Sequence, residues 1–204
     1  MNKVVDEIDF TKPIIRRKSL SASNSGNMTT TVEFPEFFSM TFDEPVKHGG
    51  EGKGPSPLQG VLASLCGCEA VTFNRTAKDM DFSYNGLKFD AEFTIDIRGR
   101  MGVRSIVPHF KTVRLQVHVN TEEEEERLRE VVEETEARCP VFNLIKDAGV
   151  EHECLWIRST QKSIHFNHIN QIKKQWKKLT KLDGLELDVW DHQWFKKYLN
   201  PVTK

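Results

Sequence analysis

Two cysteines lie two positions apart in the small, mostly apolar stretch "GPSPLQGVLASLCGCEAV", residues 54–71. A cysteine thiolate is a nucleophile and a metal ligand, whereas a protonated thiol in a core packs as a small apolar group. On a helix, Cys66 and Cys68 would point about 200° apart. This separation suits neither a disulfide nor a shared metal site, so at most one of the two belongs to any given pocket. The pair leaves open whether one thiol is a reagent or both are buried small side chains.

A third cysteine, Cys139, follows Arg138 and precedes a proline in the stretch "EARCPVF". Proline suits the first turn of a helix, so we expect Cys139 at the N-terminus of a short helix. Free backbone N–H groups and the helix dipole stabilise a thiolate there, and Arg138 adds positive charge. The residue types alone therefore favour Cys139 over Cys68 as a reactive thiol. They predict buried small side chains for Cys66 and Cys154.

The charge of the chain is balanced, with 29 basic and 30 acidic residues among 204. This balance gives no indication of nucleic acid as a partner. The N-terminal "MNKVVDEIDF" lacks the apolar core of a signal peptide, and residues 58–73 are too few and too polar to span a bilayer. We therefore expect a cytoplasmic protein that does not bind membranes and keeps its four cysteines reduced. The histidines show no metal-ligand spacing, so no metal or other cofactor is expected.

Local patterns predict the helix that carries the cysteine pair. Ser56 and Pro57 indicate a helix start, and Gln59 completes a capping box with Ser56. Apolar residues at spacings of three and four then predict a helix to about Lys78. Its buried stripe is expected to contain Leu58, Val61, Leu62, Leu65, Cys68 and Thr72.

The remaining elements follow from alternation and capping. Residues 87–99 and 109–120 alternate apolar with polar side chains, which predicts two strands joined by a long hairpin loop. Thr121 and Glu124 predict a capping box that opens a second helix. A short helix ending at Gly149 and a strand over 150–159 follow, and residues 29–42 predict one or two earlier strands. This order predicts an α+β fold with an antiparallel sheet.

Three regions are expected along the chain. Residues 1–28 are polar and Ser-rich, which predicts a flexible N-terminal segment. Residues 29–158 form the folded domain, and residues 159–204 predict a C-terminal helical appendage with an amphipathic, lysine-rich helix. This appendage is basic and residues 121–136 are acidic, so the two either dock on one another or are unrelated solvated faces.

The stretch "GPSPLQGVLASLCGCEAVTF", followed later by "LREVVEETEARCPVFNLI", resembles the OsmC/Ohr family of thiol-dependent hydroperoxide reductases. The family pattern is a proline that opens a central helix, a small-residue run that ends in Gly-Cys, and a second helix that ends in Cys-Pro. Cys68 and Cys139 match its two cysteines. The resemblance covers about residues 30–158, and the expected order of strands and helices agrees with it.

The resemblance implies an intertwined homodimer with two central helices and active sites at the subunit interface. Cys68 would be the peroxidatic thiolate that attacks an organic hydroperoxide and becomes a sulfenic acid. Cys139 would resolve it to a disulfide, and an external thiol or dithiol would reduce that disulfide. The implied role is defence against oxidative stress, without a bound cofactor.

The chain departs from the family pattern near the start of the central helix. The family places a glutamate, which holds an arginine, one or two residues after the proline, where this chain has Leu58 and Gln59. Gln59 can support the site by hydrogen bonding but brings no charge. This departure favours an alternative function, a non-peroxidase dimer of the same fold that binds a small hydrophobic ligand.

Other charged candidates for the site are less direct. Glu69 adjoins Cys68, and is expected to be either a supporting carboxyl or a carboxylate at a rim or interface. No arginine occurs between Arg17 and Arg75. The hairpin loop supplies the other candidates, Arg98, Arg100 and Arg104.

Overall fold

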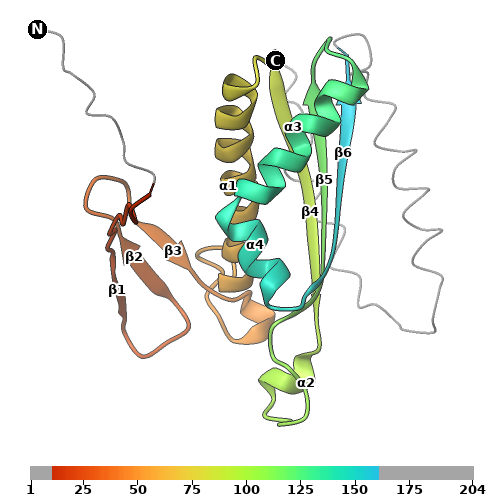
Figure 1. Ribbon diagram of the computed structural model, residues 1–204. Coiled ribbons are helices and arrows are strands. Elements are labelled where there is room, and N and C mark those ends of the chain that lie inside the picture. The colour runs from red at the N-terminus through yellow and green to blue at the C-terminus, as the bar shows by residue number, and fades with distance from the viewer. Residues whose placement is uncertain (1–10, 161–204) are drawn as a thin grey trace, which may run out of the picture. The chain divides into compact units, whose positions relative to one another are not determined.

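The computed structural model describes residues 11–160, which form two three-stranded sheets and a set of helices (Figure 1). The predicted order of strands, helix, two strands, two helices and strand is confirmed. The elements are β1 (Ser21–Asn24), β2 (Thr30–Glu33), β3 (Met40–Phe42), the 3-10 helix η1 (Val46–His48), α1 (Pro57–Asp79), β4 (Gly86–Ile95), α2 (Ile97–Arg100), β5 (Phe110–Asn120), α3 (Glu125–Arg138), α4 (Pro140–Asp147) and β6 (Glu151–Ser159).

The larger sheet has the strand order β4-β5-β6. β4 and β5 form the predicted antiparallel hairpin, in which Leu87 lies opposite Val119. β6 is parallel to β5, with Cys154 opposite Leu115, so the prediction of an antiparallel sheet is wrong for this pair. The reason is the crossover through α3 and α4, which returns the chain to the end of the sheet where β5 began.

The helices α1, α3 and α4 lie on one side of this sheet (Figure 1). The core fills the space between them with fully buried side chains from several elements. These include Leu65 and Phe73 of α1, Leu115 and Val117 of β5, and Val131 of α3. None of the helices within residues 11–160 is both long and apolar enough to cross a bilayer.

The two predicted capping boxes have different outcomes. At α1 the box is confirmed, because Ser56 Oγ accepts from the Gln59 N–H while Gln59 Oε1 accepts from the Ser56 N–H. The box predicted for Thr121 and Glu124 is wrong, since α3 begins only at Glu125. The Thr121 hydroxyl is instead buried and donates to the Ser83 carbonyl at 2.6 Å, which ties the α1–β4 turn to the end of β5.

Part of the predicted flexible segment 1–28 is a strand. β1 pairs with β2, from Ser21 opposite Glu33 to Asn24 opposite Thr30. Its four side chains are all exposed, so backbone hydrogen bonding holds the strand and leaves no apolar pattern in the sequence. The amphipathic helix predicted for residues 159–204, and its docking, lie outside the described residues beyond Thr160.

A buried carboxylate shapes the glycine-rich loop before α1. Asp43 accepts N–H groups from Glu44, Glu51 and Lys53 at 2.8–3.1 Å, and these bonds, led by that of Lys53, lower its pKa. A Cβ on Gly50 would lie only 1.8 Å from the Glu44 carbonyl oxygen, so the loop needs glycine there. Three backbone N–H groups of this segment therefore already donate to the Asp43 carboxylate.

Gly60→Ala is expected to destabilise the fold although alanine favours helices. A Cβ on Gly60 would lie 2.3 Å from Cε1 of Phe42, the last residue of β3, so the ring must move. We expect a loss of about 1–3 kcal/mol in the free energy of unfolding, measured with denaturant. In a Phe42→Ala background the same substitution should instead stabilise by up to about 1 kcal/mol. Equal effects in the two backgrounds would contradict the contact.

Candidate thiol active site

The structure brings together the two cysteines that the sequence singles out. Cys68 lies in the middle of α1 and is half-buried. Cys139 is fully buried, and it is both the C-cap residue of α3 and the N-cap residue of α4. The Cys68 thiol lies near enough to the Cys139 thiol to raise its pKa, and both are free thiols. Two segments far apart in the chain thus supply one dithiol.

The buried stripe of α1 explains why Cys68 remains accessible. The predicted stripe is partly wrong, because Val61 is 43% exposed. The side chains that α1 buries are Leu62, Leu65, Glu69, Phe73, Thr76 and Ala77. Cys68 therefore lies at the edge of the stripe, whereas its neighbour Glu69 faces the interior.

The Cys139 thiol has a higher pKa than its position at a helix N-terminus indicates. Burial raises the pKa of this thiol to about 12, and the nearby Glu69 and Cys68 raise it further, against the lowering effect of the Phe142 N–H. Arg138 directs its charge elsewhere, to Asp79 at 2.9 Å and to Glu134. The prediction of a stabilised Cys139 thiolate is therefore wrong, because loss of hydration outweighs the helix end.

Glu69 is an interior carboxyl. Its side chain is 0% exposed, which overturns the alternative of a rim or interface carboxylate. Burial raises the pKa of Glu69 to about 7. The interaction with the Cys139 thiol lowers this pKa, and the charge of Glu136 raises it. Neither carboxyl oxygen has a partner with the geometry of a hydrogen bond within the described residues.

The other predicted supporting groups are engaged away from the dithiol. Gln59 Oε1 accepts the Ser56 N–H at 2.9 Å, so this oxygen serves the helix cap. In the hairpin loop, Arg98 pairs with Asp96, and Arg100 reaches Glu44 at 3.3 Å. Arg98 therefore braces the hairpin loop itself, and Arg100 joins this loop to the segment that follows β3.

The remaining two cysteines behave as packing side chains. Cys154 lies on β6, opposite Leu115, and packs against the core with a pKa raised to about 12, chiefly by burial and by Glu136. Cys66 also packs against the core, and burial raises the pKa of its thiol. Within residues 11–160, no three His, Cys, Asp or Glu side chains gather as a metal site.

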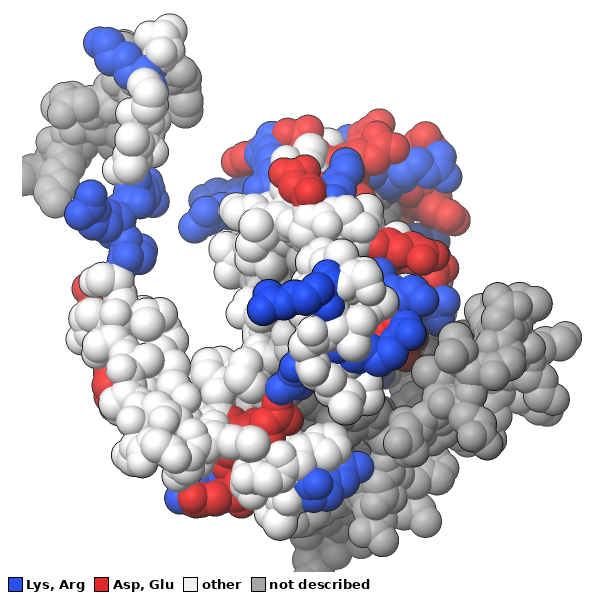
Figure 2. Space-filling view, turned by 90° about the horizontal axis from the view of Figure 1, so that it is seen from below, with Lys and Arg blue, Asp and Glu red and all other residues white. Residues whose placement is uncertain are grey.

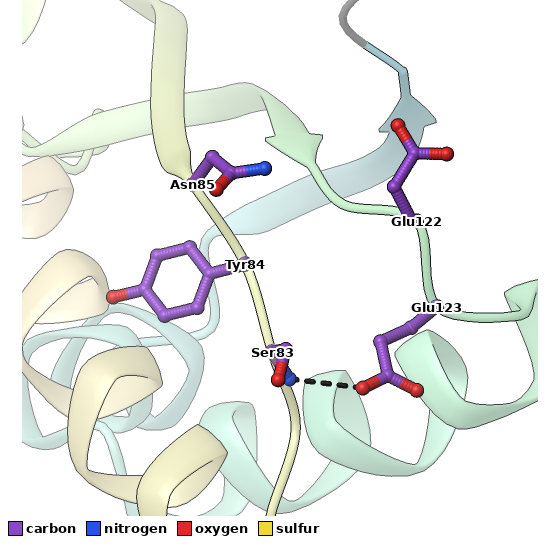
Figure 3. Close-up of a pocket in the computed structure, with 5 residues that line it drawn as sticks. All are labelled: Ser83, Tyr84, Asn85, Glu122 and Glu123. Carbon is purple, nitrogen blue, oxygen red and sulfur yellow. Dashed lines mark hydrogen bonds between the residues drawn. The ribbon is translucent and has the colours of Figure 1, made fainter.

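Two surface hollows lie beside α1 and β4. Figure 3 shows the smaller, a polar depression of about 320 Å³ in which the Ser83 N–H donates to Glu123 at 3.1 Å. This bond and the bond from Thr121 to Ser83 join the α1–β4 turn to the segment between β5 and α3, so the contacts at this hollow are structural. The larger is an open groove of about 800 Å³, whose lining includes Val71, Arg75, Tyr84, Leu87 and Phe89. The lining of the groove includes aliphatic and aromatic side chains, whereas Tyr84 is the one aromatic residue among the five described residues that line the smaller hollow.

Solved structures of known proteins share the fold. An OsmC-like protein from Mycoplasma pneumoniae is 18% identical with a TM-score of 0.61, and the match covers 72% of this chain and 99% of that one. An organic hydroperoxide resistance protein OsmC from Legionella pneumophila is 20% identical with a TM-score of 0.55, over 70% and 99% of the two chains. One from Elizabethkingia anophelis is 14% identical with a TM-score of 0.57, over 72% and 100%.

The family itself is shown by a match to a sequence model. The model described as OsmC-like protein matches residues 50–154, a range that includes both Cys68 and Cys139. Among curated proteins no significant match to the chain was found. Since the matched range is more than half of the chain and the solved OsmC-like structures share its fold, this protein belongs to the OsmC-like family.

Proposed function

We propose that the protein is a thiol-dependent hydroperoxide reductase that uses Cys68 as peroxidatic and Cys139 as resolving cysteine. The observation that supports this most is the pairing of a half-buried thiol on α1 with a fully buried thiol at the α3–α4 junction. Relatives of the same fold are named organic hydroperoxide resistance proteins, which points to organic hydroperoxides as the substrate class.

The reaction has two steps within the protein. The Cys68 thiolate attacks the terminal oxygen of the hydroperoxide, so that an S–O bond forms, the O–O bond breaks and the alcohol leaves with a proton. The sulfur of Cys139 then attacks the Cys68 sulfenic acid, an S–S bond forms and water leaves. An external thiol or dithiol reduces the disulfide by exchange.

A second copy of the chain is the partner that fits the exposed apolar surface. Around the turn between β2 and β3, Phe37 is 76% exposed and Phe38 is 96% exposed. In Figure 2 most side chains of the sheet β1–β3 are uncharged. Val61 and Val71 are further exposed apolar side chains, on α1. Large exposed apolar patches mark interfaces, so we expect a homodimer that buries them.

An alternative function is the binding of a small hydrophobic ligand without peroxidase chemistry. The observation that favours it is that Gln59, Arg98 and Arg100 are engaged in structural contacts, so none of these three activates Cys68. The open groove lined by Val71, Leu87 and Phe89 would then be the binding surface.

Peroxide consumption by the reduced protein separates the two functions. We expect the wild-type protein to consume an organic hydroperoxide faster than hydrogen peroxide, with a dithiol as reductant. Cys68→Ser should lower the rate to that of an ordinary free thiol, because it removes the attacking sulfur. Cys139→Ser should allow one turnover and stop at a sulfenic acid, which a dione reagent traps.

Cys66→Ser is the matched control, because it removes a thiol from the same helix. It should retain the wild-type rate. A wild-type rate no faster than that of free cysteine would overturn the reductase and favour the ligand-binding function.

A further inference from the structure

Glu69 is a fully buried, ionisable side chain at the dithiol that the two-step reaction leaves without a role. It directly follows Cys68 on α1 and is 0% exposed. Both of its carboxyl oxygens lack a hydrogen-bond partner within the described residues. A buried carboxyl without a partner is costly, and a group of this kind in a native fold calls for an explanation.

Among the described residues, the side chains that act on the Glu69 carboxyl are a thiol and a second carboxyl, and no cation is among them. From the α3–α4 junction the Cys139 thiol interacts with its carboxyl, and from α3 the Glu136 carboxyl acts on it. The charge of Glu69 in turn raises the pKa of Cys66 on its own helix and of Cys154 on β6. Glu136 is itself occupied, because its Oε1 accepts from Trp156 Nε1 at 3.0 Å. Glu69 is therefore the carboxyl free to act on Cys139.

We propose that Glu69 is the base that takes the proton of Cys139 when Cys139 attacks the oxidised Cys68. The inference rests on the proposed function, because it assigns the proton transfer of the resolving step. The juxtaposition that carries it is a fully buried thiol beside a fully buried, unpartnered carboxyl, one residue from the thiol that becomes oxidised.

The resolving step balances with these groups alone. The S–S bond forms between Cys139 and Cys68 as the S–O bond of the Cys68 sulfenic acid breaks. The Cys139 proton passes to Glu69 and from there to the departing hydroxide, which leaves as water. Cys139 is oxidised and the sulfenic sulfur is reduced, so no further oxidant is needed. Glu69 ends the step ionised, as it began.

The two groups suit these roles near neutral pH. Cys139 remains a thiol, since burial raises its pKa to about 12, and a thiol is a poor nucleophile until it loses its proton. Glu69, with its pKa raised to about 7 by burial, is ionised in part near neutral pH. A base is most effective when its pKa lies close to the working pH.

A quenched-flow experiment isolates the step. The reduced protein is mixed with one equivalent of an organic hydroperoxide and quenched into a sulfenic-acid-trapping dione. Mass spectrometry then follows the conversion of the Cys68 sulfenic acid into the Cys68–Cys139 disulfide. In the wild type the rate of conversion should rise through about pH 7 and level off above it. Glu69→Gln should slow the conversion by about 10²-fold and remove this inflection.

Glu133→Gln, at an exposed glutamate of the same helix α3, is the matched control and should keep the wild-type profile. A conversion in Glu69→Gln as fast as in the wild type would overturn the role of Glu69 while leaving the reductase intact. A wild-type rate that shows no inflection near neutral pH would overturn it as well, even where the Gln variant fails to fold. If the wild type forms no sulfenic acid at all, it is the proposed function that fails.

Discussion

Phe73→Ala is expected to lower the free energy of unfolding by about 3–5 kcal/mol. Phe73 is 0% exposed and lies on the buried stripe of α1, one turn after Glu69. Its ring stacks on that of Trp156 at 5.2 Å between centroids, and meets Tyr84 edge-on at 5.0 Å. Truncation leaves a cavity where α1, β6 and the start of β4 meet. Chemical denaturation followed by circular dichroism measures the loss.

Phe73→Leu is the control for this prediction, because it keeps most of the apolar volume. It should cost less than the alanine substitution. A cost below about 1 kcal/mol for Phe73→Ala would mean that the site is not packed as the structure has it.

The contribution of Glu69 to the free energy of unfolding is expected to fall as the pH rises from about 4.5 to about 7. Burial raises the pKa of Glu69 from its ordinary value of 4.5 to about 7, so the folded state binds this proton more tightly than the unfolded state. The contribution of Glu69 is therefore fully present below about pH 4.5 and is lost as the pH rises through about 7. It corresponds to about 3 kcal/mol.

Unfolding with denaturant at a series of pH values measures this loss. Glu69→Gln, which does not titrate, should lose less stability than the wild type over the same interval. Glu133→Gln changes an exposed glutamate of α3 and should leave the wild-type profile unchanged. Parallel profiles for the wild type and Glu69→Gln would contradict the burial of an uncompensated carboxyl.

The sequence predicts well those parts of the fold that short-range chemistry decides. The capping box of Ser56 and Gln59 fixes the start of α1, and alternation fixes the β4–β5 hairpin. Thr121 and Glu124 have the same spacing as a capping box, yet Thr121 bonds to Ser83, a distant residue. The direction of β6 likewise depends on how α3 and α4 cross the sheet.

The sequence selects the two cysteines that lie together in the structure, but it does not predict the pKa values around them. The resemblance to the OsmC/Ohr pattern selects Cys68 and Cys139, and the structure places them together. A glutamate beside a cysteine is usually expected to face solvent, so the burial of Glu69 has no signal in the sequence beyond its adjacency to Cys68. The high pKa of Cys139 depends on the tertiary burial of a helix end.

The measurement that tests the central claim most directly is the mapping of disulfides after oxidation. The reduced protein is treated with one equivalent of an organic hydroperoxide, digested at acidic pH and examined by mass spectrometry. The two-cysteine account predicts one intrachain bond between Cys68 and Cys139, absent from Cys68→Ser and from Cys139→Ser, and unaffected by Cys66→Ser. Consumption of the peroxide without that bond, or no consumption beyond that of a free thiol, would contradict it.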